Sequence, residues 1–379
     1  MSQCEDVVGP QPHINKIILM KKHYIIILLL LGAQISVFPQ EIVYQAGLHN
    51  FFDNNEFADC PVGFSQTMAG VHLVPQLGIE WNTKHRIFVG VDAMHEYGSN
   101  KTFGYHDLIA YYEYDNKPFR FYMGAFPRKL AVDKYPLFFF QDSVTNYRPV
   151  MNGFFWEINS KKGDYMNIWL DWISRQTDNI RETFFMGWSG RYNWKVLYAQ
   201  HFGYMYHFAG TMDPATDMSV HDNGRVWTAL GVDLASKTQF DELSANAGWA
   251  VGLEQDRATN TGWQCPQGLL SEIRVEYKGI GAFNTYYKGK SQELYFNEFG
   301  NQLYWGDRLY RATRYDRLDG YLYFLKTDNI ALKFIFSLHF VGPGMYTEQQ
   351  LYATFDLDNL KNKKPSKKYH YLWENWLSK

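Results

Sequence analysis

Long apolar runs are missing from this chain of 379 residues, although 46% of its residues are hydrophobic and 18% are aromatic. The apolar stretch at residues 24–31 is too short to cross a bilayer, which takes about 20 residues as a helix. Apolar side chains are therefore plentiful but dispersed. A chain of this kind that crosses a membrane must do so as a closed β-barrel, in which strands satisfy every backbone group.

Cysteine is scarce and an excess of positive charge is absent. The chain has 3 cysteines, of which only Cys60 and Cys265 would remain after export, both on the predicted loop side of the barrel. They could pair in an oxidising compartment or stay as two unpaired thiols, and the sequence leaves both open. The formal net charge is −2. This argues against nucleic acid as a partner, because nucleic-acid-binding proteins carry basic patches.

Motifs for common enzyme chemistry are missing as well. The chain has no G-x-S-x-G elbow, no H-E-x-x-H pair, no phosphate-binding glycine loop and no dinucleotide fingerprint. Histidines and aspartates gather around residues 208–224, but their spacing matches no calcium-binding loop, so a solvated loop is expected there. These are His201, His207, His221, Asp213, Asp217 and Asp222. Ser–His and Asp–His pairs leave no sequence signature, because the partners meet in space. We expect no metal, no cofactor and no enzymatic activity.

The strongest positive feature is a regular alternation of connections. Aromatic-rich segments of about ten residues, the length of a transmembrane strand, are separated by tight turns and longer polar loops in strict succession. The tight turns are predicted at 82–85, 115–117, 161–164, 192–194, 236–239, 278–279 and 326–329. The loops are predicted at 51–65, 99–105, 129–150, 176–180, 208–224, 255–262, 289–308 and 341–346. Short turns on one side and long loops on the other are typical of outer-membrane β-barrels. A soluble β-sandwich or propeller is the alternative, but it does not favour such a division.

Within the predicted strands, apolar side chains occupy every second position, as a lipid-facing strand requires. Residues 329–340 are the clearest case, with Phe334 and Phe336 on one face and Lys333 and His339 on the other. Seven turns and eight loops give an all-β, antiparallel transmembrane barrel of sixteen strands. Fourteen strands are possible, because residues 184–192 and 195–201 alternate poorly.

The ends of the chain suggest how the barrel is delivered. Residues 20–40 have the basic start, short apolar stretch and small-residue exit of a signal peptide, and residues 1–19 are interpreted as an upstream start. The barrel is predicted over 41–358, and residues 359–379 form a basic tail. An even strand number places both ends of the barrel at the periplasmic side of the outer membrane.

The predicted interior carries charges of both signs. These are Arg120, Asp171, Asp233, Glu272, Arg274, Glu276, Lys333 and Asp356. Because a barrel of about 16 strands leaves an aqueous channel, we expect these residues to line a pore. The alternative is that they pair across strands and hold the wall together.

The loop at residues 129–150 is the longest predicted connection and lies between predicted strands five and six. Residues 137–140 read Leu-Phe-Phe-Phe, which suits a loop packed into the barrel better than one exposed to water. In position the loop resembles that of general porins, whose third loop folds inward and narrows the pore. That resemblance implies a constriction formed by Lys129, Asp133, Lys134, Asp142 and Arg148. The alternative is a loop over the barrel mouth or against a partner.

More broadly, the chain resembles porin-like outer-membrane proteins of Bacteroidota. The stretches that carry the resemblance begin at Phe126 (FPRKL), Phe140 (FQDS), Tyr147 (YRPVMNGFFW), Ser174 (SRQT) and His201 (HFGYMYHFAG). The expected function is passive or weakly selective diffusion of small hydrophilic solutes, in contact with membrane lipid and lipopolysaccharide and as a possible homo-oligomer. A plugged barrel that binds or assembles with other envelope proteins is the second interpretation. A hydrolase acting on lipid or a surface substrate is the third.

Overall fold

The computed structural model describes residues 40–213, 219–259, 262–360, 370–371 and 373. Sixteen antiparallel strands form one closed barrel, in which β1 pairs with β2 on one side and with β16 on the other. The prediction of sixteen strands is therefore confirmed, and fourteen is excluded. The predicted signal peptide and upstream segment lie outside the described residues, apart from Gln40, and so does most of the predicted tail.

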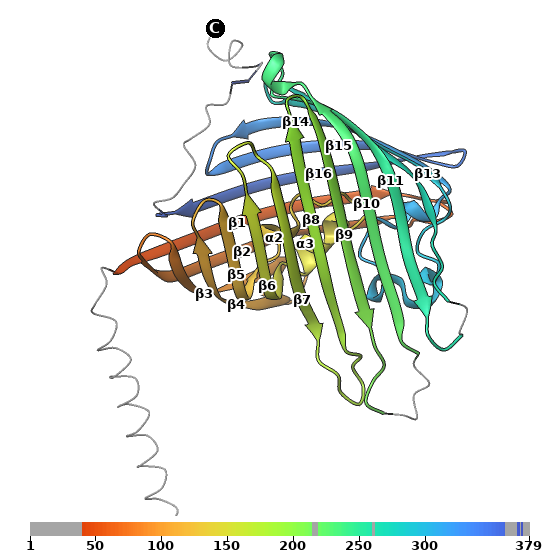
Figure 1. Ribbon diagram of the computed structural model, residues 1–379, viewed down its shortest axis with the longest axis horizontal. Coiled ribbons are helices and arrows are strands. Elements are labelled where there is room, and N and C mark those ends of the chain that lie inside the picture. The colour runs from red at the N-terminus through yellow and green to blue at the C-terminus, as the bar shows by residue number, and fades with distance from the viewer. Residues whose placement is uncertain (1–39, 214–218, 260–261, 361–369, 372, 374–379) are drawn as a thin grey trace, which may run out of the picture.

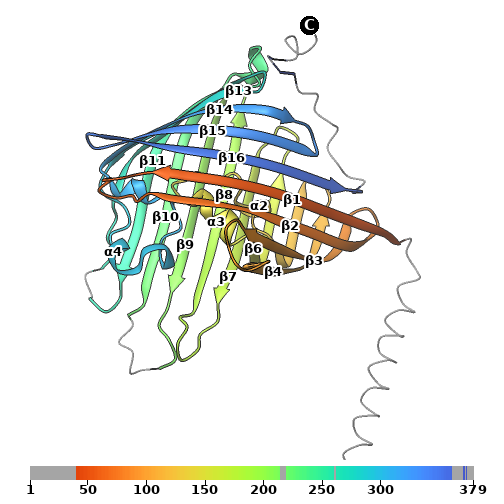
Figure 2. The ribbon, with the colours of Figure 1, turned by 180° about the vertical axis from the view of Figure 1, so that it is seen from behind.

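The strands follow the order of the chain around the barrel, as the colours in Figures 1 and 2 show. Their bounds are β1 Gln40–Glu56, β2 Gln66–Trp81, β3 His85–Glu96, β4 Tyr105–Asp115, β5 Phe119–Pro127, β6 Val150–Asn159, β7 Tyr165–Ser174, β8 Thr183–Trp194, β9 Leu197–Phe208, β10 His221–Asp233, β11 Glu242–Asp256, β12 Gln267–Tyr277, β13 Ile280–Gly289, β14 Arg314–Lys326, β15 Ile330–Val341 and β16 Gly344–Asp358.

The outer surface of the barrel is apolar at alternate strand positions. Val89 is 56% exposed, Met166 62% and Leu230 72%, whereas their inward-facing neighbours Phe88 and Trp169 are fully buried. The alternation read from the sequence is thus the alternation of the two faces. Exposed apolar side chains in this arrangement suit a lipid environment rather than water. Within the described residues, no helix is long and apolar enough to cross a membrane.

The two ends of the barrel differ. At one end, here called the turn end, the connections are mostly short and β1 begins where β16 stops. The other, the loop end, carries the longer connections, with one exception. The loop predicted at 341–346 is a tight hairpin in which β15 ends at Val341 and β16 begins at Gly344. Gly342 has φ +59°, a left-handed conformation that suits a short hairpin turn, so this prediction of a long loop is wrong.

Two connections from the loop end fold into the lumen. The first, residues 128–149, contains α2 (Lys129–Val132) and α3 (Asp142–Tyr147), which lie inside the ring of strands in Figures 1 and 2. The second, residues 290–313, contains α4 (Phe296–Phe299), η3 (Gly300–Gln302) and η4 (Arg308–Arg311). The inward packing predicted for the first is confirmed. The second is longer and was not predicted to enter the lumen, so the expectation that the first is the longest connection is wrong.

A further connection, between β10 and β11 at the turn end, contains η2 (Ala235–Lys237). The two cysteines of the barrel are both free thiols, with Cys60 buried and Cys265 exposed. Of the two alternatives left by the sequence, the structure therefore shows unpaired thiols.

Candidate functional site

The lumen is filled on one side by aromatic side chains from the two inward segments. Phe138, Phe139 and Phe140 are buried and pack against rings of the barrel wall. The ring centroids of Phe140 and Trp169 are 6.1 Å apart, and those of Phe138 and Tyr310, which belongs to the second segment, are 5.1 Å apart. Large buried rings packed edge to face form a rigid core. The two segments and the strands around β7–β13 therefore make one hydrophobic core inside the barrel.

Buried ion pairs fasten both segments to the wall. Arg128 pairs with Asp171 of β7 at 2.5 Å and also donates hydrogen bonds to the carbonyl oxygens of Arg148 and Val150. In the second segment, Glu293 pairs with Arg225 of β10 at 2.6 Å. Burial raises the pKa of Glu293 to about 7, an effect that the adjacent guanidinium opposes.

The five predicted constriction residues do not form one ring. Lys129 and Asp133 line a cavity of about 600 Å³ toward the turn end, called here the turn-end cavity. Arg148 lines a separate cavity of about 310 Å³, the loop-end cavity, and stacks on Trp305. Asp142 lies away from both, and Lys134 lies 3.6 Å from the ring of Tyr165. The five residues therefore lie in different parts of the lumen, and their role in a constriction stays a prediction.

Most of the predicted pore-lining charges are paired, Asp171 with Arg128 of the first inward segment and the others with side chains of other strands. The distances are 3.0 Å for Arg120–Glu157, 2.5 Å for Asp171–Arg128, 3.2 Å for Asp233–Arg191, 3.7 Å for Arg274–Glu242, 3.0 Å for Glu276–Lys326 and 2.8 Å for Asp356–His49. Glu272 accepts a hydrogen bond from Asn246, and Lys333 lies over the ring of Tyr321. The contacts between strands are the cross-strand pairing that the sequence left open as the alternative, and a role of the same residues in lining a pore stays a prediction.

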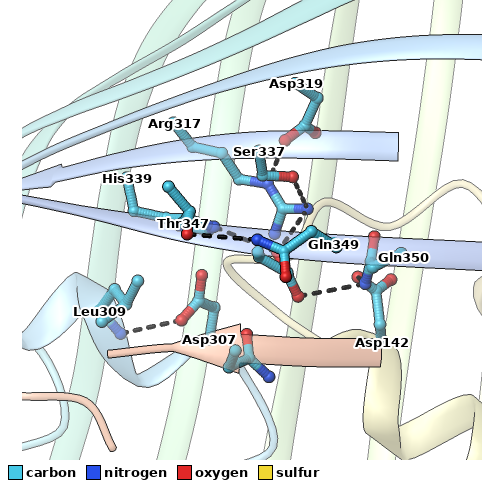
Figure 3. Close-up of polar contacts among 12 residues, drawn as sticks. Asp142, Asp307, Leu309, Arg317, Asp319, Ser337, His339, Thr347, Gln349 and Gln350 are labelled. Atoms are coloured by element: carbon cyan, nitrogen blue, oxygen red, sulfur yellow. Dashed lines mark hydrogen bonds and ion pairs between the residues drawn. The ribbon is translucent and has the colours of Figure 1, made fainter. Parts of the chain in front are cut away.

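A polar network on β14–β16 meets α3 in the lumen (Figure 3). Gln350 donates to Asp142 of α3 at 3.0 Å, and Arg317 bridges Asp319 at 2.7 Å and Glu348 at 3.1 Å. His339 lies between Tyr315 at 2.9 Å and Glu348 at 3.1 Å, so both of its ring nitrogens are engaged. The adjoining cavity holds only about 60 Å³. This arrangement fixes α3 and leaves little room for a substrate.

A different arrangement occupies the loop end, where β10 begins and β11 ends. Nδ1 of His221 lies 3.4 Å from the Oγ of Ser219 and 3.3 Å from the carbonyl oxygen of the same residue. Nε2 of His221 lies 3.9 Å from a carboxylate oxygen of Asp256. His221 and Asp256 face each other directly in the β10–β11 ladder, so the pairing of the strands sets their separation. The imidazole is buried and packs edge to face on Phe299 of α4, 4.4 Å away. A hydroxyl, an imidazole and a carboxylate thus lie in sequence.

A cation and a phenol complete the surroundings of this rim triad, defined as Ser219, His221 and Asp256. Arg181 donates to the carbonyl oxygen of Ser219 at 3.0 Å, and its guanidinium lies over the ring of Phe208. Burial lowers the pKa of Arg181, but an arginine remains charged in proteins. Burial, and then the carboxylate of Asp256, raise the pKa of Tyr295, whose ring contacts His221. Positive charge therefore lies beside the backbone carbonyl group of Ser219.

The sequence placed His221 near this rim but not its partners. His207 and Asp222 lie close to each other, and Asp222 is bound by Arg257 at 2.6 Å, so this carboxylate is not available to His221. Asp217 lies outside the described residues, and His201 belongs to β9. Ser219 lies only two residues before His221 in the chain, whereas Asp256 could have been found only from the register of β10 against β11, which places residues 221 and 256 side by side.

Comparisons with known proteins give a family and a fold. The family model described as Lipid A 3'-O-deacylase-type matches residues 39–361. No curated protein matches the chain. Because the matched family is described by an enzymatic activity, the expectation that this protein is not an enzyme is wrong.

Solved structures with the same type of barrel share little sequence with the chain. The loop L8 deletion mutant of OmpT, an outer membrane protein of Vibrio cholerae, has 9% identity and a TM-score of 0.50, with 84% of this chain and 99% of that chain covered. OccK11 of Pseudomonas aeruginosa has 10% identity and a TM-score of 0.48, with 84% and 96% covered. OprB of Pseudomonas putida has 10% identity and a TM-score of 0.44, with 84% and 94% covered. At such identities the likeness concerns the fold alone.

Proposed function

Because the chain belongs to the Lipid A 3'-O-deacylase-type family, we propose that it hydrolyses an acyl ester of an outer-membrane lipid at the loop end of its barrel. The family description supplies the substrate class, an acyl chain ester-linked to lipid A. The apolar outer surface supports a place in the outer membrane, with the turn end in the periplasm and the loop end facing outward. The observation that carries the proposal is the rim triad.

In the proposed reaction, the Oγ of Ser219 attacks the carbonyl carbon of the ester while Nδ1 of His221 takes the hydroxyl proton. The hydrogen on Nε2 then faces Asp256, which stabilises the imidazolium. The positive charge of Arg181 stabilises the negative charge that develops on the carbonyl oxygen. Collapse of the tetrahedral intermediate expels the alcohol, which takes the proton from His221, and water then hydrolyses the acyl-serine by the same steps.

The distances of the triad fit an enzyme without its substrate. The 3.4 Å and 3.9 Å separations exceed those of strong hydrogen bonds. Catalytic hydrogen bonds are often long without substrate and tighten in the complex. His221 is already fixed by Phe299 and Tyr295, so a small movement of Ser219 and Asp256 would complete the arrangement.

The test is fatty-acid release from lipid A by the purified full chain in detergent, with Ser219→Ala, His221→Gln and Asp256→Asn. Each variant is expected to lower kcat by roughly 10³-fold or more, as loss of a triad member does. His207→Gln is the matched control, because His207 is a rim histidine that also faces a carboxylate but lies outside the triad. Full activity in Ser219→Ala, or equal loss in His207→Gln, would contradict the proposal.

A second candidate function is a passage for small hydrophilic solutes, as the sequence suggested. It is favoured by the position of the turn-end and loop-end cavities, which approach α3 from different sides. The test is conductance in planar bilayers with and without deletion of residues 134–146. Stepwise current that grows in the deletion variant would support a passage restricted by α3. Absence of stepwise current from both the full chain and the deletion variant would exclude a passage for solutes.

A further inference from the structure

The turn-end cavity has the size and the walls of a ligand-binding site. Its volume of about 600 Å³ lies within the roughly 300–1,000 Å³ typical of small-molecule sites. Side chains of β1–β5 and β16 line it on one side, and residues of the first inward segment on the other. The cavity is distinct from the rim triad, because none of the triad residues lines it.

Apart from Nη1 of Arg128, which is ion-paired with Asp171, three polar atoms among the residues that line this cavity are buried and have no hydrogen-bond partner within the described structure. They are Nε2 of His72, Oε1 of Gln76 and Nδ2 of Asn146. His72 is only 5% exposed and Gln76 only 7%. Buried polar groups in native proteins are almost always hydrogen-bonded, so unpaired ones beside a cavity indicate groups that a bound molecule would satisfy.

The chemistry of these atoms defines what that molecule must offer. Nδ1 of His72 lies 2.6 Å from the carboxylate of Asp92, and in a neutral imidazole that donates from Nδ1 to this carboxylate, Nε2 is an acceptor. Gln76 presents a second acceptor, and Asn146 presents a donor. A ligand must therefore donate twice and accept once. Hydroxyl groups do both.

The spacing of the acceptors gives the length of the ligand. His72 and Gln76 are four residues apart on the inward face of β2, so their Cα atoms are separated by about 13 Å at the rise of an antiparallel strand. A ligand that reaches both is elongated. Buried rings of Phe51, Tyr111 and Tyr122 also line the cavity and offer apolar surfaces for flat, weakly polar faces.

The residues that line the cavity include two cations, Arg128 and Lys129, and more carboxylates, which are Asp92, Glu113, Asp133, Asp356 and Asp358. Lys129 lies 3.7 Å from Asp356, which also pairs with His49, and Glu113 pairs with Arg86 at 2.7 Å. Arg128 is bound to Asp171. Because carboxylates outnumber cations, the site disfavours an anion, and because most of the charges are paired, it suits a neutral ligand.

We propose that the turn-end cavity binds a neutral oligosaccharide of at least two rings, with hydroxyl groups donating to Nε2 of His72 and Oε1 of Gln76 and accepting from Nδ2 of Asn146. The aromatic rings contact the faces of the sugar. This binding is independent of ester hydrolysis at the rim triad and requires no acyl chain.

The experiment is equilibrium dialysis of the detergent-purified full chain against radiolabelled maltose, cellobiose and N,N'-diacetylchitobiose, with glucose as the single-ring comparison. At least one disaccharide is expected to bind saturably, and at least 10-fold more tightly than glucose. Gln76→Leu is expected to weaken that binding at least 10-fold. Gln66→Leu, on the same strand but outside the turn-end cavity, is the matched control and is expected to bind normally.

The outcomes separate this proposal from the proposed hydrolase. Ser219→Ala is expected to keep full disaccharide binding, and Gln76→Leu is expected to keep fatty-acid release. Absence of saturable binding to all three disaccharides, or an equal loss in Gln66→Leu, would overturn the oligosaccharide site. A normal heat-dependent gel mobility of each variant shows that its barrel is folded, so that a loss of binding can be assigned to the cavity.

Discussion

Arg128 joins three parts of the lumen through one side chain. Its guanidinium pairs with Asp171 of β7 and donates to the backbone where the first inward segment returns to the wall, at Arg148 and Val150. The side chains of Arg128 and Asp171 are almost completely buried. Such a pair is costly to break from one side, because the remaining charge stays buried without its partner.

Arg128→Met is therefore expected to destabilise the protein by about 3–5 kcal/mol, the cost of leaving a buried charge unpaired. The measurement is the free energy of unfolding in urea in the presence of detergent. Arg274→Met is the control, because Arg274 and Glu242 are about half exposed and 3.7 Å apart. Exposed pairs contribute about 0–1 kcal/mol. Equal effects of the two substitutions would contradict this role of Arg128.

At the scale of elements, the alternation of apolar and polar residues in the sequence predicted the strands and their two faces. The sequence did not predict features that depend on contacts between distant segments of the chain. The outward positions of β15 and β7 could be read directly, because each strand has an apolar and a polar face. The Phe138–Phe140 cluster predicted an inward loop in the same way. The roles of charged residues on the inner face were harder to predict. Whether Asp171 faces a water-filled lumen or binds Arg128 depends on a loop elsewhere in the chain.

The second inward segment also could not be predicted from a local sequence pattern. Its apolar residues, such as Leu303, Trp305 and Leu309, are interspersed with polar ones and form no continuous run. They are buried because the first segment and strands β8–β14 surround them, which no local pattern reveals. The rim triad is similar, since Asp256 meets His221 only through the register of two strands.

Tyr304 is the residue through which the second segment can be tested. Its hydroxyl donates to Glu254 of β11 at 2.5 Å and accepts from the backbone N–H of Tyr295. Tyr304→Phe is expected to cost about 1–3 kcal/mol, because it leaves buried polar groups without a partner. The loosened segment should be cleaved faster by trypsin after Arg308 or Arg311, as measured by mass spectrometry.

Tyr192→Phe serves as the control for that measurement, because Tyr192 is 64% exposed on the outer surface. Its cleavage pattern should match that of the unmodified protein. Unchanged proteolysis in Tyr304→Phe would show that the hydroxyl does not hold the second segment in place.

At the scale of the whole molecule, stability rests on closure of the ladder. β1 pairs with β16 from Gln45 to Glu56, and no strand edge is left unpaired in the described barrel. Closed barrels resist detergent because every strand is bonded on both sides. Unheated protein is therefore expected to migrate faster than the heated 44.5 kDa chain on a detergent gel.

Thr354→Pro is expected to abolish this heat-dependent shift. Thr354 lies between His49 of β1 and Ala331 of β15, and proline removes a donor from the middle of the ladder. Thr354→Val is the control, because it keeps the backbone N–H and the β-branched shape. A preserved shift in the proline variant would mean that the β1–β16 seam is not needed for closure.

The β1–β16 seam also sets an order of events in time. Tyr44 of β1 and Asn359 beside β16 are hydrogen-bonded across 315 positions of sequence, whereas every other pair of neighbouring strands is consecutive in the chain. Hairpins can form as soon as their two strands are available, but the seam must wait for the last strand. Until then β1 has an unpaired edge that can join another chain. The interval between synthesis of the first and last strands is therefore the period in which this protein most needs a chaperone.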